Sequence, residues 1–280
     1  MIAFTDVRRP IRLNYSTLQM RKVRVAMACA AGLLLAGSSA GLASTTSAWK
    51  VDAAGGWNTP DNWSAAIPAA AGDEADLTFD LTAARIVTID TAVSLGTLKI
   101  GDSGPTAFAY TLARSGSFTL TMDNGAAHAV IEESATSAGD TISAPVTLNS
   151  DLDVYSLATG KTLEISSTIA ANNHAISIGT ATATNLGTVR IDASTPFSGT
   201  PTITVNSGIL SLNTRTGSVT SLVVNSGASV TAGSFVISTS GALTLNGSFS
   251  SSFTTGTSGM TVGSGVLYMP IGAVPGALRN

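Results

Sequence analysis

One short phrase occurs four times between residues 187 and 266: Val205-Asn206-Ser207-Gly208, Val224-Asn225-Ser226-Gly227, Leu245-Asn246-Gly247 and Val262-Gly263-Ser264-Gly265. The phrases end at Gly208, Gly227, Gly247 and Gly265, so they recur at nearly even steps. A constant period near twenty residues is typical of a solenoid, in which no repeat can bury its apolar side alone and each stacks on its neighbours. The phrase therefore predicts a stack of similar coils.

The composition of the 280-residue chain favours short strands joined by tight turns. Charged residues make up 11%, aromatic residues 5% and hydrophobic residues 44% of the chain. Small and β-branched residues with frequent glycine favour repeated short strands and turns. Alternating runs recur at residues 85–90, 95–101, 118–122, 146–154, 162–165, 175–179 and 187–191. We find no helical stripe after residue 48.

A parallel solenoid explains these runs better than a sandwich of hairpins, because successive phrases resemble one another at one coil's separation. Stacking in register turns every second, apolar side chain inward and Ser and Thr outward, with Asn and Gly at the corners. We therefore expect an all-β chain in which residues 81–269 form the coils of a parallel β-helix. Residues 270–280 are expected to be a disordered tail.

The N-terminal region has the layout of a secretory signal. A basic run at residues 20–24 precedes an apolar stretch at 25–36 and small residues at 37–43. We expect a helical signal peptide at residues 20–48. The apolar stretch is shorter than the about 20 residues of a transmembrane helix, so no membrane span is expected in the mature chain.

Small residues before two alanines give two expected cleavage positions, after Ala43 or after Ala48. Residues 1–19 are expected to be an unstructured or non-native start. The single cysteine, Cys29, lies inside the signal. The exported chain would then have no disulfide, so its stability must come from stacking and hydrogen bonding.

Residues 49–80 differ in composition from the rest and contain all three tryptophans: Trp49, Trp57 and Trp63. The first coil of a solenoid has an open edge that could pair with another chain, so it is usually atypical and protected. We expect an aromatic-rich cap over this edge. The alternative is a carbohydrate contact at Trp57 and Trp63, because the faces of tryptophan rings suit stacking on sugars.

The charge distribution argues against nucleic acid as a partner. The formal net charge is −3, but from Trp49 onward 8 Lys and Arg stand against 16 Asp and Glu, which gives −8. Binding to nucleic acid requires clustered positive charge. No carboxylate follows Asp192, so the clearest repeats hold no candidate for acid–base catalysis and no acidic ligands for calcium.

One acidic pair is a candidate for chemistry, and a second is not. Asp151 and Asp153 stand two apart in a strand run and should share one face, where they could act as acid and base or bind a cation. No Arg, Lys or His lies near them in sequence to complete such a site. Glu132 and Glu133 are expected to point to opposite faces as solvated residues.

The two histidines, His128 and His174, have no metal-binding spacing and no cysteine to help them. We expect both at surface or turn positions, and we expect no metal and no cofactor. The sequence contains no nucleophile elbow, phosphate loop or dinucleotide fingerprint. Two short threonine arrays fit the ordinary outward polar face of strands: Thr119 with Thr121, and Thr200 with Thr202 and Thr204.

One segment carries a family resemblance: Gly187-Thr188-Val189-Arg190-Ile191-Asp192-Ala193-Ser194, then Phe197-Ser198-Gly199-Thr200, then Ile203-Thr204-Val205-Asn206-Ser207-Gly208-Ile209-Leu210-Ser211-Leu212. It resembles the autotransporter-associated β-strand repeat of long bacterial surface proteins. The Gly-Trp, Asn-Trp, Pro, Asp and Phe pattern of residues 55–79 resembles the N-terminus of secreted proteins carrying such repeats in Planctomycetes- and Verrucomicrobia-like bacteria. The resemblance implies a right-handed parallel β-helix that is exported and displayed outside the cell.

The sequence shows neither the C-terminal membrane barrel of an autotransporter nor a C-terminal Pro-Glu-Pro anchor with a basic tail. The means of attachment to a surface is therefore open. We expect a secreted or cell-surface structural or adhesive β-helix module, passenger-like and without catalysis of its own. Its partners would be polysaccharide or other surface components.

Two alternatives stay open. One is a carbohydrate-binding or polysaccharide-degrading protein on the same scaffold, and the other is an incomplete gene product without activity. An enzyme should place Asp151, Asp153 or other acidic residues in a cleft with a basic partner, whereas a scaffold should not.

Overall fold

The computed structural model describes residues 44–180, 186–237, 242–255, 260–262 and 267–268. The basic and apolar runs of the expected signal, with Ala43, lie outside these residues, as does the expected tail at 270–280. The described residues form strands and one 3-10 turn, η1 (Pro60–Asn62), with no α-helix. Accordingly, we find in them no helix of the length and apolarity that a membrane crossing requires.

The strands form three sheets in which every strand-to-strand pairing is parallel. The first sheet has ten strands, in the order β1 (Thr46–Ala48), β3 (Glu74–Leu77), β6 (Thr97–Ile100), β9 (Ala129–Glu133), β12 (Leu152–Ser156), β15 (Ile176–Ile178), β18 (Thr202–Val205), β21 (Ser221–Val224), β23 (Leu243–Leu245) and β25 (Met260–Val262).

The second sheet has eleven strands, ten of them in the order β2 (Gly55–Gly56), β4 (Arg85–Ile89), β7 (Tyr110–Arg114), β10 (Thr141–Ile142), β13 (Thr162–Ile165), β16 (Thr188–Ile191), β19 (Ile209–Ser211), β22 (Ser229–Ile237), β24 (Ser248–Thr255) and β26 (Leu267–Tyr268). Its eleventh strand, β20 (Thr216–Val219), pairs with β22. The third sheet has five strands, in the order β17 (Phe197–Ser198), β14 (Ile169–Ala170), β11 (Val146–Leu148), β8 (Leu120–Met122) and β5 (Val93–Leu95).

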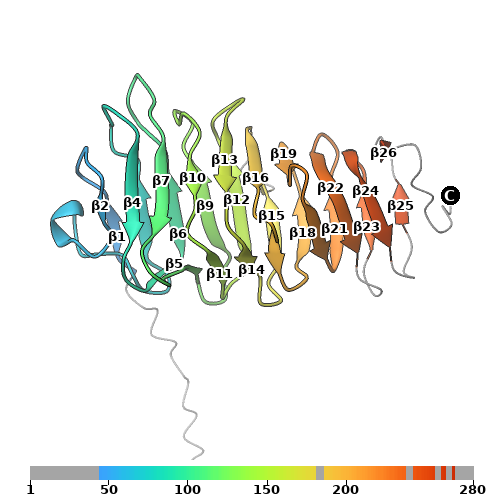
Figure 1. Cartoon of the computed structure of the whole chain (residues 1–280), viewed down its shortest axis with the longest axis horizontal. Coiled ribbons are helices and arrows are strands. Elements are labelled where there is room, and N and C mark those ends of the chain that lie inside the picture. The colour runs from blue at the N-terminus through green and yellow to red at the C-terminus, as the bar shows by residue number, and fades with distance from the viewer. Residues whose placement is uncertain (1–43, 181–185, 238–241, 256–259, 263–266, 269–280) are drawn as a thin grey trace, which may run out of the picture. The chain divides into compact units, whose positions relative to one another are not determined.

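The chain winds through the sheets in a fixed sequence. From β4 it passes through β5 to β6, and β7 then returns to the second sheet beside β4. Figure 1 shows the same strands side by side, coil after coil, from β1 to β25. The expected all-β parallel solenoid is therefore confirmed.

The core is built from inward-facing side chains that stack directly above one another. One such row runs along the first sheet: Leu98, Ile131, Val154, Ile178, Val205, Val224 and Leu245. Each of these side chains is at most 1% exposed. Burying one side chain of this kind contributes about 1.5–3 kcal/mol, so the row is a principal source of the stability of the stack.

The repeated phrase corresponds to the shortest coils. Fewer residues separate Ile203 from its partner Leu222 than separate Leu152 from its partner Ile176. The difference arises because the third sheet ends at β17, so later coils turn without a strand there. Gly208 and Gly227 each follow the strand and adopt positive φ angles of 66° and 82°, which glycine reaches without steric cost. The fourth phrase is described only as far as Val262.

The first coil is covered along its outer edge. Trp49 and Trp63 form an antiparallel bridge, the Lys50 N–H donates to the Asn62 carbonyl at 2.9 Å, and the Ser64 N–H donates to the Ala48 carbonyl at 2.8 Å. The segment after η1 therefore folds back along β1 and pairs with the edge that would otherwise be free to pair with another chain.

Candidate functional site

Three neighbouring strands of the first sheet, β9, β12 and β15, bring four titratable side chains together where the strands begin. His128 directly precedes β9, Asp151 directly precedes β12, and His174 lies two residues before β15. Asp153 lies within β12 and points to the same side as Asp151, because side chains in this strand alternate between buried and partly exposed. Parallel stacking in register aligns the starts of these strands, so residues one coil apart become neighbours.

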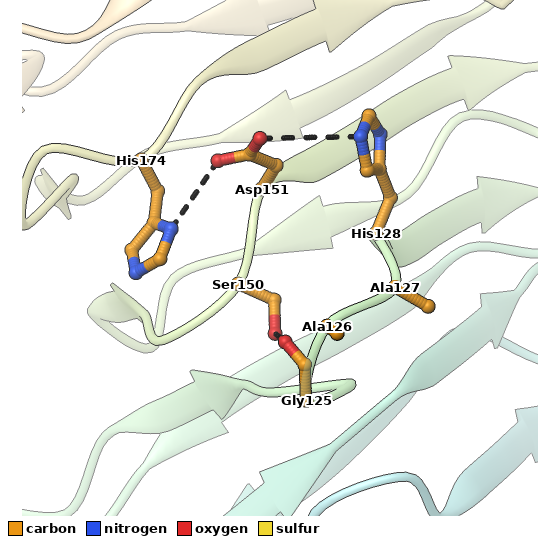
Figure 2. Close-up of a pocket in the computed structure, with 7 residues that line it drawn as sticks. All are labelled: Gly125, Ala126, Ala127, His128, Ser150, Asp151 and His174. Carbon is orange, nitrogen blue, oxygen red and sulfur yellow. Dashed lines mark hydrogen bonds and ion pairs between the residues drawn. The ribbon is translucent and has the colours of Figure 1, made fainter. Parts of the chain in front are cut away.

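Asp151 lies between the two histidines. Its Oδ1 is 3.2 Å from His174 Nδ1, and its Oδ2 is 3.9 Å from His128 Nε2. Oδ1 also accepts the Ala175 N–H at 2.9 Å. The other nitrogen of the His128 ring, Nδ1, lies 3.0 Å from Asp153 Oδ1. Figure 2 shows Asp151 with one imidazole on either side.

Three of the four titratable side chains, those of His128, Asp151 and His174, line a depression of about 260 Å³, here named the His–Asp pocket. Its other lining residues are Gly125, Ala126, Ala127 and Ser150. The side chains of His128 and Asp151 are 52% and 43% exposed, and that of Asp153 is 16% exposed. The pocket is therefore open to solvent, and its rim carries both hydrogen-bond donors and hydrogen-bond acceptors.

The local hydrogen bonds shift the pKa values of Asp151 and His128 in opposite directions. The hydrogen bond from the Ala175 N–H holds the pKa of Asp151 below its ordinary value, and the contact with the His174 ring lowers it further. The hydrogen bond to Asp153 raises the pKa of His128. The pocket thus presents a carboxylate beside an imidazole that takes up a proton more readily than a free histidine.

Ser150 does not supply a nucleophile. Its hydroxyl donates to the Gly125 carbonyl at 3.0 Å and accepts the Asn124 N–H at 2.8 Å, and the residue is 2% exposed. Within the described part of the chain, no group of three or more His, Cys, Asp or Glu side chains has the geometry to hold a metal ion. What the pocket offers is hydrogen bonding and proton exchange.

The structure confirms two expectations about this site: Asp151 and Asp153 share a face, and both histidines lie at surface positions. No Arg, Lys or His lies near the acidic pair along the chain, but stacking brings His128 and His174 beside it from the neighbouring coils. A signal was present: Asp151 stands 23 residues from His174, and it stands equally far from His128 on the other side.

Trp57 and Trp63, for which carbohydrate contact was the alternative to a cap, lie inside the first coil. They are 0% and 1% exposed, and their rings meet edge to face at a centroid distance of 4.7 Å. Trp57 Nε1 donates to the Pro68 carbonyl and Trp63 Nε1 donates to the Trp57 carbonyl, both at 2.8 Å. Neither ring presents a face to solvent on which a sugar could stack.

Glu132 and Glu133 do point to opposite faces, but Glu133 is not solvated. It is 0% exposed at the end of β9, while Glu132 faces outward and accepts the Tyr155 hydroxyl at 3.0 Å. The alternation of the strand, which turns every second side chain inward, overrides the preference of the charge for water.

Comparisons with protein-family models, with curated proteins and with solved structures found no match to this chain.

Proposed function

We propose that this chain is a secreted or cell-surface structural and adhesive β-solenoid whose contact with polysaccharide is made at the His–Asp pocket. The observation that carries the proposal is the position of Asp151 between His128 and His174 on an exposed face. Carboxylate and imidazole groups at the rim of an open depression match the hydroxyl groups of a sugar, which both donate and accept hydrogen bonds.

The scaffold supports an adhesive role. Its strands alternate buried apolar side chains with partly exposed ones, many of them serine and threonine, and its N-terminal edge is paired by the chain itself. A rigid stack with a covered edge can carry a binding face without joining other sheets.

Export is proposed from the signal-like sequence at residues 20–48. Of the two expected cleavage positions, we retain Ala43, because β1 (Thr46–Ala48) pairs with β3 as the first strand of the stack. A chain cut after Ala48 would lose that strand and the Ala48 carbonyl, which accepts the Ser64 N–H.

Polysaccharide cleavage is the second candidate, and one specific observation favours it. Asp151 lines a depression together with two histidines, and an acidic residue in a cleft with a basic partner was the feature expected of an enzyme rather than of a scaffold. His128 could then donate a proton while Asp151 accepts one. The exposure of His128 and Asp151 weighs against cleavage, because charged groups act more strongly on a reacting bond when they are shielded from bulk solvent.

The test is a polysaccharide panel scored for both retention and product release, with wild type, Asp151→Ala, His128→Ala and Glu164→Ala. Glu164 pairs with Arg190 on the second sheet, so Glu164→Ala is a surface control on another face. We expect retention without turnover, lost by about tenfold or more in the two pocket variants and unchanged in the control.

Two results would count against the proposal. Product release that Asp151→Ala abolishes would make the chain an enzyme. Equal retention by all four proteins would move the contact away from the His–Asp pocket.

A further inference from the structure

A second group of polar side chains lies inside the stack, away from the His–Asp pocket. It occupies the corner where the chain leaves β9 for β10, and it contains two carboxyl groups: Glu133, which is 0% exposed, and Asp140, which is 1% exposed. Ser137 at 3% and Ser156 at 0% are buried with them. Two carboxylates in such a site are costly unless donors satisfy their oxygens or one of them holds a proton.

Ser137 is the decisive residue, because its hydroxyl contacts both carboxyl groups. Its Oγ lies 3.0 Å from Glu133 Oε1 and 2.5 Å from Asp140 Oδ2, and it also accepts the Gly139 N–H at 2.9 Å. A hydroxyl has one proton to donate and two lone pairs that accept. It can therefore donate to only one of the two carboxyl groups.

Burial raises the pKa of both Glu133 and Asp140, and the remaining contacts favour Asp140 as the group that carries a proton. Glu133 accepts from the Asp140 N–H at 3.0 Å and contacts the Ser156 hydroxyl, so it is well supplied with partners as an anion. Asp140 Oδ1 accepts the Tyr110 N–H at 2.7 Å, and its Oδ2 has the Ser137 oxygen as its partner. When Asp140 Oδ2 carries a proton, it donates a hydrogen bond to Ser137 Oγ, and the Ser137 hydroxyl donates its own hydrogen bond to Glu133. Every polar group in this row of contacts then has a partner.

We propose that Asp140 is a neutral carboxylic acid in the folded protein below neutral pH, and that the hydrogen bond made by its proton holds the corner between β9 and β10 closed. When this proton is lost, Ser137 faces two carboxylates with one hydrogen to donate, and the corner loosens while the stacked sheets persist. The inference concerns the scaffold and does not depend on the His–Asp pocket.

The charged groups around Asp140 are consistent with this assignment. Glu133 lies on the first-sheet side, and Tyr110 begins β7 on the coil before, near Asp102. Lys161, Glu164 and Arg190 line a depression of about 330 Å³ that reaches Asp140, and Arg190 pairs with Glu164. Desolvation, followed by the proximity of Glu133, raises the pKa of Asp140 to about 7.

Because folding raises the pKa of Asp140, the closed corner is most stable at low pH. A carboxyl group whose pKa is raised from 3.8 to about 7 stabilises the closed corner fully below about pH 4. This contribution falls as the pH rises between the two pKa values, and it is lost above about 7. Opening of the corner should therefore become easier from mildly acidic to neutral pH and level off in alkali.

The experiment is amide hydrogen exchange of the full chain, followed at residues 133–140 from pH 4 to pH 9, for wild type and Asp140→Asn. The Asn amide donates to Ser137 as the protonated acid does, and it carries no titratable group. The ratio of wild-type to variant exchange rates removes the intrinsic effect of pH on exchange. We expect the ratio to rise by up to about tenfold per pH unit below neutral pH and then to become constant. Amides of β18 and β21 serve as the internal control and should show a constant ratio.

Glu133→Gln is the second variant, needed in case Asp140→Asn does not fold. Removing the neighbouring negative charge should lower the pKa of Asp140 and move the midpoint of the exchange profile to lower pH. Infrared spectroscopy of the wild type at pH 6 should show the band of a protonated carboxyl group that Asp140→Asn removes. A ratio independent of pH, or the absence of that band, would overturn the proposal.

Discussion

The side-chain amide of Asn225 donates to Asn206 Oδ1, in the preceding coil, at 2.9 Å. The amide of Asn206 in turn donates to the Gly179 carbonyl at 2.8 Å. Asn206 and Asn225, from the first two copies of the phrase, therefore occupy the same corner in successive coils, and each links its coil to the previous one. This stacking gives a physical reason for an asparagine where the strand ends in these two copies.

Asn225→Ala should lower the free energy of unfolding by about 1 kcal/mol, because Asn206 Oδ1 loses its donor and one link between coils disappears. The measurement is urea denaturation of the full chain. Ser226→Ala, an exposed position in the same turn, is the matched control and should change stability by less than about 0.5 kcal/mol. Equal effects of the two substitutions would show that the amide link contributes nothing.

Trp63→Ala should be among the most destabilising substitutions, at about 3–5 kcal/mol, because it removes a fully buried ring from the first coil. It also weakens the bridge that covers β1, so we expect more self-association than in wild type, measured by size-exclusion chromatography. Phe118→Ala is the control, since this ring is 39% exposed. A Trp63→Ala protein with wild-type stability and elution would contradict the capping role.

Asp102 is a buried carboxylate that orders the corner after β6. It accepts the N–H groups of Leu81, Gly104 and Phe108 at 3.2, 2.7 and 2.8 Å. Asp102→Ala leaves these donors without their acceptor, so we expect a loss of about 3 kcal/mol or more in urea denaturation. Asp61→Ala, at an exposed position, should be nearly neutral. If Asp102→Ala were as mild as Asp61→Ala, the amides must find other partners.

Alternation along the sequence was sufficient to predict the fold but not the corners. Residues 146–154 looked like one strand, yet the structure divides them into β11 and β12 around a turn at Asn149 and Ser150. The division was hidden because inward and outward side chains keep alternating through the turn: Ser150 is buried and Asp151 is not. A period of two shows which way side chains point, but not where the chain bends.

The His–Asp pocket was missed for a different reason. Its members come from three coils, so their proximity depends on the coil length, which varies along the chain. Leu152 pairs with Ala129 of the preceding coil, and Ile203 pairs with Ile176 of the preceding coil. More residues separate Ile203 from Ile176 than separate Leu152 from Ala129. The repeated phrase revealed a regular period only where the coils are shortest. The buried pair Glu133 and Asp140 was missed because part of the hydrogen bonding that satisfies it comes from other coils: the Ser156 hydroxyl contacts Glu133, and the Tyr110 N–H donates to Asp140.

Asp153 should control the protonation of His128. The hydrogen bond between His128 Nδ1 and Asp153 Oδ1 raises the pKa of His128 above 6.5. We therefore expect Asp153→Asn to lower that pKa toward the ordinary value, measured by NMR titration of the imidazole resonances. Glu164→Gln, on the second sheet, should leave the titration unchanged.

The same ion pair has a predictable effect on stability. A histidine whose pKa is raised by folding stabilises the protein fully below about pH 6.5, and this contribution is lost as the pH rises through the raised value. The contribution is small because the His128 side chain is 52% exposed. The difference in unfolding free energy between wild type and Asp153→Asn should thus be larger at pH 5.5 than at pH 8.5. A difference that grows with pH would mean that Asp153 stabilises the turn through a contact other than the charge of His128.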